Sequence, residues 1–205
     1  MTLRLIATIL FISIAIFAVS VASQADASLN SDQKAVLKNI SDQMNENKAL
    51  SGDFIQTGPN GETAKGVFFL KRPGQMRFKY ADPSTIDIIA DGKSVAVINT
   101  QLETQDLLPI KNTPLRYLLR DKLNLTKVDG IKNVGLIGNN IVIIIEDAEA
   151  FNESQLRLFF NKDTYALEQW IVTDAQGLDT SVQLFNTRPA VEETPGLFEI
   201  KYPVQ

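Results

Sequence analysis

Residues 65–80 read as two β-strands joined by a Pro-Gly turn, and no other stretch constrains the fold of this chain as strongly. Side chains in a strand point alternately to its two faces. Phe68, Leu70 and Arg72 therefore share one face, so that an arginine continues a row of apolar side chains. The pattern alone leaves two interpretations of Arg72. It is either a residue at the rim of the sheet whose charged end reaches solvent, or a buried donor of several hydrogen bonds.

Short strand patterns and turn residues alternate along most of the remaining chain. Turn sequences such as Asp91-Gly92 join neighbouring strands into hairpins. We expect strands over residues 53–57, 64–71, 75–80, 86–90, 94–99, 104–108, 131–137, 141–146, 155–161, 165–173 and 179–186, with Leu197 to Tyr202 closing the chain. Hairpins between strands that are adjacent in sequence predict one highly curved antiparallel sheet.

Two helices are expected beside the sheet. Apolar residues recur every three to four positions over residues 31–48, which is typical of a helix with one buried stripe. A second, short helix follows Thr113-Pro114, and its apolar stripe consists of Leu115, Leu118 and Leu119. The fold class is therefore α+β and mainly β. Two helices of this size fill the concave face of such a sheet poorly, and this mismatch points to a cavity.

An apolar run without charged residues occupies residues 5–21 near the N-terminus. It is at the lower edge of the length that spans a membrane, and an A-x-A pattern follows at residues 25–27. We expect a secretory signal peptide over residues 1–27 that is cleaved at its end. Cleavage after Ser23 and an uncleaved membrane anchor are the alternatives. A single domain then spans residues 28–205.

The composition excludes most kinds of catalysis. The chain contains no histidine and no cysteine, so it lacks the usual general base, the usual zinc ligands and every Ser-His or Cys-His pair. Carboxylate or lysine chemistry passes this test, but no carboxylate pair is placed beside a nucleophile. A net charge of −4 without a basic tract argues against nucleic acid. We expect no enzyme, no metal and no cofactor.

A set of apolar residues is expected on the inner face of the sheet and on the second helix. Ordinary core packing and the wall of a cavity are both compatible with this set. Trp170, the only tryptophan, is expected to be structural. The candidate cavity residues are Phe54, Phe68, Leu70, Met76, Phe78, Ile88, Leu115, Leu118, Leu119, Leu156, Leu158 and Phe160.

Several motifs follow one another in a characteristic order. They are Gly66-x5-Arg72-Pro73-Gly74-x2-Arg77-Phe78-x-Tyr80-x2-Pro83, Ile88-Ile89-Ala90-Asp91-Gly92, Asn112-Thr113-Pro114-Leu115, Gln169-Trp170-x3-Asp174-Ala175-Gln176-Gly177 and Leu197-Phe198-x-Ile200-x2-Pro203. Each motif is weak alone, but their joint order covers nearly all of the chain after the signal segment. In this order they resemble the outer-membrane lipoprotein carrier protein family, the LolA-like periplasmic chaperones.

This resemblance implies a fold, a function and partners. The fold is an incomplete antiparallel β-barrel with helices covering a concave hydrophobic cavity. The protein is expected to be a monomer in the periplasm. Its cavity takes the acyl chains of lipoproteins that an inner-membrane ABC transporter releases, and an outer-membrane acceptor receives them. Arg72 matches the family's arginine that holds the lid shut, and Phe78 and Leu115 line the cavity beside it.

The chain departs from the family pattern in two places. Val95-Ala96-Val97-Ile98 occupies positions after the Asp-Gly turn where relatives often have aromatic residues, so the shape of the cavity is expected to differ. The sequence stops at Gln205, so a C-terminal strand or loop found in longer relatives is expected to be absent.

Other functions remain compatible with the sequence. The nearest alternative is an acceptor or dual-role lipoprotein-binding protein, or a lipoprotein sensor domain, of the same architecture. An envelope hydrolase and a purely structural envelope domain are more distant alternatives.

Overall fold

The computed structural model describes residues 29–146, 155–190 and 195–201. The predicted signal peptide over residues 1–27 lies outside the described residues, as do Tyr202 and the residues after it. Within the described ranges, no helix is both long enough and apolar enough to cross a membrane.

Eleven strands form one antiparallel sheet in the order β6-β5-β4-β3-β2-β1-β11-β10-β9-β8-β7. Strands that are neighbours in the sheet are also neighbours in sequence, except for β1 and β11. The strands are β1 (Ala49–Thr57), β2 (Thr63–Lys71), β3 (Gln75–Tyr80), β4 (Ile86–Asp91), β5 (Ser94–Asn99), β6 (Thr104–Pro109), β7 (Ile131–Ile137), β8 (Asn140–Glu146), β9 (Gln155–Asn161), β10 (Leu167–Thr173) and β11 (Asp179–Pro189).

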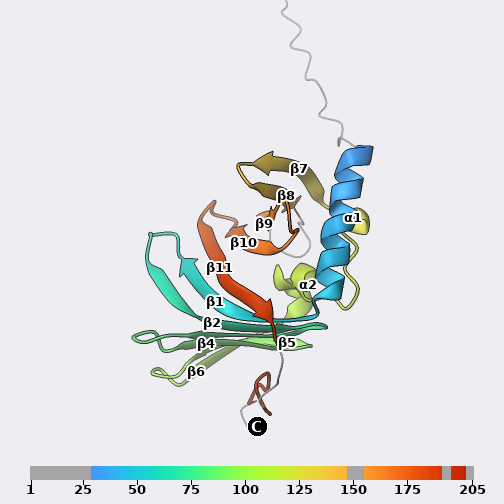
Figure 1. Ribbon diagram of the computed structural model, residues 1–205. Coiled ribbons are helices and arrows are strands. Elements are labelled where there is room, and N and C mark those ends of the chain that lie inside the picture. The colour runs from blue at the N-terminus through green and yellow to red at the C-terminus, as the bar shows by residue number, and fades with distance from the viewer. Residues whose placement is uncertain (1–28, 147–154, 191–194, 202–205) are drawn as a thin grey trace, which may run out of the picture.

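The sheet is strongly curved but not closed. Figure 1 shows β6 at one end of the curve and β7 at the other, and these two edge strands do not pair with each other in the described sheet. The predicted fold class, an incomplete antiparallel barrel with few helices, is confirmed. Short hairpins with local turn sequences produce this order because each strand finds its partner next to it in the chain.

Helix α1 (Ser31–Glu46) runs along the strand ends on one side of the sheet (Figure 1). Its N-terminus is closed by a reciprocal capping box between Asn30 and Gln33. Its buried stripe includes Leu37, Ile40 and Met44. The stripe faces the interior of the curve, so α1 covers the open end of the concave side.

The chain between β6 and β7 enters the interior of the curve. It contains the short helices η1 (Ile110–Asn112), α2 (Leu115–Leu118) and η2 (Leu125–Lys127). Tyr117, Leu118, Leu119, Leu123 and Leu125 from this segment are buried in the same cluster as the inner side chains of the sheet. Figure 1 shows α2 between the two halves of the sheet. Helices α1 and α2 together therefore fill much of the concave side.

A second, small apolar cluster lies apart from this core. Ile200, near the end of the described chain, packs with Ile89 of β4 and Ala96 of β5. Ile89 alternates with the inner residue Ala90 along β4, so this cluster belongs to the outer face of the sheet.

Three predicted segments differ from the structure. The second helix is a single turn with Pro114 at its N-cap, and the hydroxyl of Thr113 donates to the carbonyl oxygen of Ile110 instead of capping the helix. Strand β10 begins at Leu167 rather than at residue 165, because Tyr165 has φ 56° and belongs to the preceding turn. The closing segment forms turns over residues 195–198 and no strand over residues 199–201.

Candidate functional site

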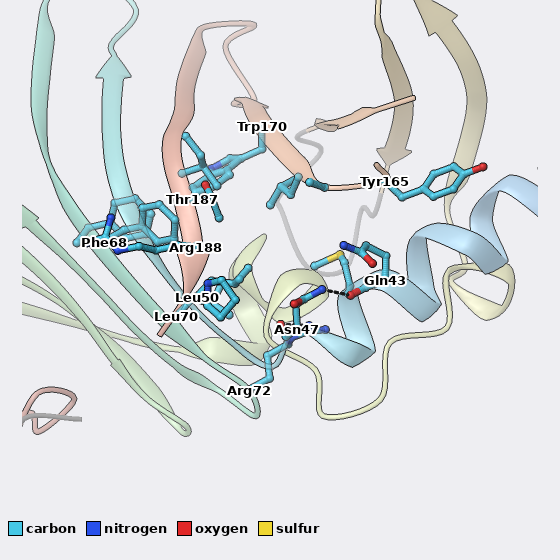
Figure 2. A pocket seen from close by; sticks show the side chains of 16 residues that line it. Gln43, Asn47, Leu50, Phe68, Leu70, Arg72, Tyr165, Trp170, Thr187 and Arg188 are labelled. Carbon is cyan, nitrogen blue, oxygen red and sulfur yellow. Dashed lines mark hydrogen bonds between the residues drawn. The ribbon is translucent and has the colours of Figure 1, made fainter. Parts of the chain in front are cut away.

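A cavity of about 230 Å³ lies between α1, the ends of β1, β2 and β11 beside it, and the turn before β10. Figure 2 shows how its side chains converge from these elements. The wall consists of Gln43, Met44, Asn47, Leu50, Phe68, Leu70, Arg72, Phe78, Tyr165, Ala166, Leu167, Trp170, Leu184, Thr187, Arg188 and Pro189.

The predicted cavity residues divide into two groups. Phe68, Leu70, Phe78 and Arg72 line this cavity. The others pack in the core beside it or against it, namely Phe54, Met76, Ile88, Leu115, Leu118, Leu119, Leu156, Leu158 and Phe160. The structure thus gathers Phe68, Leu70 and Phe78 of β2 and β3 at one wall, while Met76 of β3 and the predicted residues of β1, β4, β9 and α2 belong to the core beside it.

Trp170 belongs to the cavity wall, which the sequence analysis missed. It is 8% exposed and meets the ring of Phe78 edge to face, with centroids 5.8 Å apart. Phe78 in turn stacks on Phe68. The alternation of side chains along β10 places Trp170 on one face, but only the pairing of β10 with β11 shows that this face is the inner one.

The rest of the wall comes from α1, the turn before β10 and the end of β11. Met44 and Leu50 continue apolar patterns that are visible in the sequence. Thr187 and Arg188 carry no such signal, because they join the cavity where the register of β11 with β1 shifts. Nothing in a single sequence identifies them.

Arg72 lies in the turn after β2 and is 3% exposed. Its Nη2 donates a hydrogen bond to the carbonyl oxygen of Asn47, the C-cap of α1, at 2.9 Å. Its backbone N–H donates to the carbonyl oxygen of Lys48 at 2.8 Å. Arg72 therefore contacts the end of the helix that covers the cavity, while the role of a latch stays a prediction.

The guanidinium of Arg72 is not fully hydrogen-bonded. Its Nε and Nη1 are buried and have no partner among the described residues. Burial lowers the pKa of Arg72, and the charge of Asp121 opposes this shift. The group still carries its charge at neutral pH, since arginine titrates far above it. A buried charge with unused donors is costly. The burial of the Arg72 guanidinium therefore lowers the stability of this arrangement.

The size of the cavity limits what it holds in this state. Ligand pockets usually measure ~300–1,000 Å³, and an apolar protein cavity of ~150 Å³ holds one benzene ring. The present cavity of about 230 Å³ therefore has room for part of one long apolar chain.

The wall is suited to apolar contents rather than to acid–base chemistry. Its described lining contains no carboxylate, histidine or cysteine. Within the described ranges, no group of three or more His, Cys, Asp or Glu side chains is placed to hold a metal ion. The polar side chains of the lining lie among Met44, Leu50, Leu70 and the aromatic rings. Such a wall favours the burial of apolar groups.

The family described as "Outer membrane lipoprotein carrier protein LolA" matches residues 45–201 of this chain. The match includes Arg72, every strand of the sheet and α2, and it begins near the end of α1. No curated protein sequence matches the chain.

Solved structures of other proteins share the fold. The chain is similar to MucB in a crystal structure, with a TM-score of 0.51, 10% identity, and coverage of 84% of this chain and 64% of that chain. It is similar to a chain of the Pseudomonas aeruginosa MucA/MucB complex, with a TM-score of 0.50, 11% identity, and coverage of 83% and 62%. The chain thus spans less than two thirds of these structures.

A LolA superfamily protein from Nitrosomonas europaea also resembles the chain. Its TM-score is 0.44 at 8% identity, with coverage of 81% of this chain and 97% of that chain.

Proposed function

Because the chain belongs to the outer membrane lipoprotein carrier protein family, we propose that it is a periplasmic carrier of lipoproteins. It binds their acyl chains in the apolar cavity and carries them from the inner to the outer membrane without catalysing a reaction. The observation that carries this proposal is the apolar cavity beneath the end of α1, next to the incompletely hydrogen-bonded Arg72.

Binding of acyl chains follows from the apolar wall. Burial of one methylene group contributes about 0.8 kcal/mol, so even part of a chain binds well. Release is the harder step for a carrier. A closed empty state that competes with cargo lowers the apparent affinity and makes release possible.

Arg72 is the residue best placed to stabilise that closed state. In the closed state its Nη2 holds the carbonyl of Asn47, while its other donors are unused. When the end of α1 moves to admit a chain, this hydrogen bond breaks and the guanidinium gains access to water. The two states then differ by this hydrogen bond, with a net contribution of about 1 kcal/mol, and by the hydration of the guanidinium.

Loading requires such a movement because the cavity is too small for a lipoprotein with several acyl chains. We propose that α1 and the segment from α2 to η2 form the lid. An inner-membrane ABC transporter supplies the cargo and an outer-membrane acceptor receives it. The proposal includes a cleaved signal peptide over residues 1–27, a single carrier domain over residues 28–205, and a monomeric state.

The proposal is tested with the full chain expressed with its N-terminal segment and purified from the periplasm. Native mass spectrometry is expected to detect a bound acylated lipoprotein. Repeated absence of bound lipid or lipoprotein would contradict the carrier role and favour a structural domain. Cargo that binds but never passes to acceptor membranes would favour a sensor or an acceptor.

The latch is tested by Arg72→Leu. This variant is expected to fold, to stay loaded with lipoprotein and to fail to pass it on, because its closed state no longer competes with cargo. Arg120→Leu is the matched control, since Arg120 is exposed. Loading and transfer by Arg72→Leu at the rate of the unaltered protein would show that Arg72 is not a latch.

A further inference from the structure

The sheet is forked between β10 and β11. Pairing of β11 with β10 runs from Asp179 to Gln183 and stops there, whereas pairing of β11 with β1 continues to Pro189. Strand β10 in turn stays paired with β9 as far as Leu167. Beyond Gln183, β11 continues along β1 as far as Pro189, whereas β10 ends at Leu167 beside β9, and the space between them opens toward α1.

A β-bulge in β11 follows just beyond the end of this pairing. The register with β1 shifts between Ser51 and Asp53, where β11 has one extra residue. At this point Asn186 has φ 50°, in the left-handed region that few non-glycine residues adopt. Gly52 lies opposite, and a Cβ there would come 2.6 Å from the carbonyl oxygen of Phe185. The bulge and the glycine together allow the strand to bend away from β10.

The fork opens directly into the cavity. Leu167 from the side of β10 and Leu184 and Thr187 from the side of β11 all line it, and Gln43 of α1 lies on the same wall (Figure 2). Thr187 is exposed, so the wall reaches solvent here. On the other side of β11, β1 pairs with β2 along its whole length and leaves no gap.

Among the described residues, a surface hydrogen bond joins α1 to the turn before β10 on this side of the cavity. The side chain of Asn39 on α1 donates a hydrogen bond to the hydroxyl of Tyr165, in the turn before β10, at 3.2 Å and on the surface. Such an exposed bond contributes little to stability. On the opposite side, Arg72 and Asn47 meet through a part-buried hydrogen bond of 2.9 Å.

Arg188 gives the rim of the fork a positive charge. Its side chain is exposed and lines the cavity, and its Nη1 reaches the carbonyl oxygen of Asn186 only at 3.4 Å. A guanidinium presents several donors and binds carboxylate or carbonyl oxygens well. An acyl chain carries such oxygens at one end only, and that end remains at the surface when the chain enters an apolar cavity.

We propose that acyl chains enter and leave the cavity sideways, through the fork between β10 and β11, and that Arg188 binds the ester or carboxylate oxygens of the chain at the rim. This inference rests on the proposed function, since it assigns a port to the same cavity. A port at this place means that the lid need not leave the strand ends completely, because the acyl chain passes beside α1 rather than beneath its whole length.

The port is tested with single cysteines, which are unique because the chain has none. Thr187→Cys is coupled to a bulky maleimide, and uptake of a fluorescent fatty acid is followed through Trp170. Uptake is expected to slow by about tenfold or more after coupling, equivalent to ~1.4 kcal/mol in the barrier. Leu178→Cys, in the exposed turn at the opposite end of the β10–β11 hairpin, is the coupled control and is expected to take up the probe normally.

Ala166→Cys, on the other side of the fork, provides a second blocking site if Thr187→Cys folds poorly. Normal uptake by both coupled variants would overturn the port, although the carrier function would stand. Failure of the unaltered protein to bind any acyl probe would instead overturn the proposed function, and the port with it.

The role of Arg188 is tested by Arg188→Gln with palmitate, with hexadecanol and with a triacylated lipopeptide. Affinity for palmitate is expected to fall about twofold to fivefold, as for an exposed ion pair, and hexadecanol binding is expected to stay constant. Arg188→Lys keeps the charge and most of the affinity. A matching loss for the lipopeptide would identify ester oxygens as the contact, and a loss for palmitate alone would identify a carboxylate. No loss for either acyl probe, or an equal loss for hexadecanol, would overturn the assignment.

Discussion

Two arginines of one hairpin use their hydrogen-bond donors in opposite ways. Arg77 points to the outer face, where its Nε and Nη2 donate to the two oxygens of Asp87 at 3.1 and 2.5 Å. Its Nη1 donates to the carbonyl oxygen of Leu197 at 3.2 Å. Arg72 leaves two donors unused on the inner side. Arg77 is therefore suited to fasten the C-terminal segment permanently, and Arg72 to a contact that is broken and remade.

Arg77→Gln is expected to lower the free energy of unfolding by about 1–3 kcal/mol, because it breaks a half-buried bidentate pair whose side chains are 24% and 16% exposed. Chemical denaturation measures this loss. Lys38→Gln breaks the exposed pair with Asp42 on α1 and is expected to cost at most about 0.5 kcal/mol. Equal losses of unfolding free energy in the two variants would show that the Arg77–Asp87 pair is no more stabilising than an exposed pair.

Ionisation of the Tyr80 hydroxyl is expected to lower the stability of the protein at alkaline pH. Burial raises the pKa of Tyr80 to about 12 from 10.0, and its hydroxyl donates a hydrogen bond to Gln56. A raised folded-state pKa stabilises the protein below pH 10, and this contribution is lost between pH 10 and about 12. The loss is about 2–3 kcal/mol. Denaturation across this pH range measures it.

Tyr80→Phe is the control for this transition. It removes the phenol but keeps the ring that meets Phe54 edge to face. Its unfolding free energy should therefore decline less steeply above pH 10 than that of the unaltered protein. The remaining decline includes Tyr117, whose pKa burial also raises. Parallel curves for the two proteins would show that Tyr80 titrates normally.

At the scale of elements, α1 is tied to the segment from α2 to η2. The hydroxyl of Ser41 donates to the carbonyl oxygen of Leu37 and accepts from the backbone N–H of Leu125 at 2.9 Å. The side-chain amide of Asn45 bonds both backbone groups of Leu123, at 2.8 and 2.9 Å. These elements are therefore expected to move as one lid, with its break point at the contact between α1 and Arg72.

Asn45→Ala is expected to cost about 1–3 kcal/mol, because both backbone groups of Leu123 lose their partner. Hydrogen exchange measures the effect locally, and faster exchange is expected at residues 123–125. Asn39→Ala removes an exposed bond of similar length and should leave both stability and exchange nearly unchanged. Unaltered exchange at residues 123–125 in Asn45→Ala would show that α1 and this segment are not coupled.

Sequence patterns predicted local hairpins better than contacts between segments that are distant in the sequence. Strands alternate locally and turns carry their own residues, so the hairpins from β2 to β5 are found almost to the residue. The fork is different, because the bulge at Asn186 depends on Gly52 more than one hundred residues earlier. Arg188 and Thr187 become cavity residues through this distant pairing. The face of Arg72 follows from alternation, but its contact with Asn47 does not.

At the scale of the whole molecule, an open sheet encloses more space than its helices fill. Eleven strands curve around α1 and the segment between β6 and β7 without closing, and the space left over is the cavity of about 230 Å³. Side chains that line an apolar cavity make fewer packing contacts than side chains in a filled core. Under the proposed function, an acyl chain in this cavity is expected to recover those contacts. The proposed function therefore predicts that the loaded protein is larger than the closed one.

The central claim is that acyl chains occupy this cavity, and the single tryptophan tests it directly. Trp170 lies in the cavity wall and is the only source of tryptophan fluorescence. The measurement is a titration of the purified protein with a triacylated lipopeptide that carries bromine atoms on its acyl chains. Saturable quenching of Trp170 is predicted, with no quenching by the same peptide without acyl chains. Lipopeptide that binds without quenching Trp170, or no binding at all, would contradict the account.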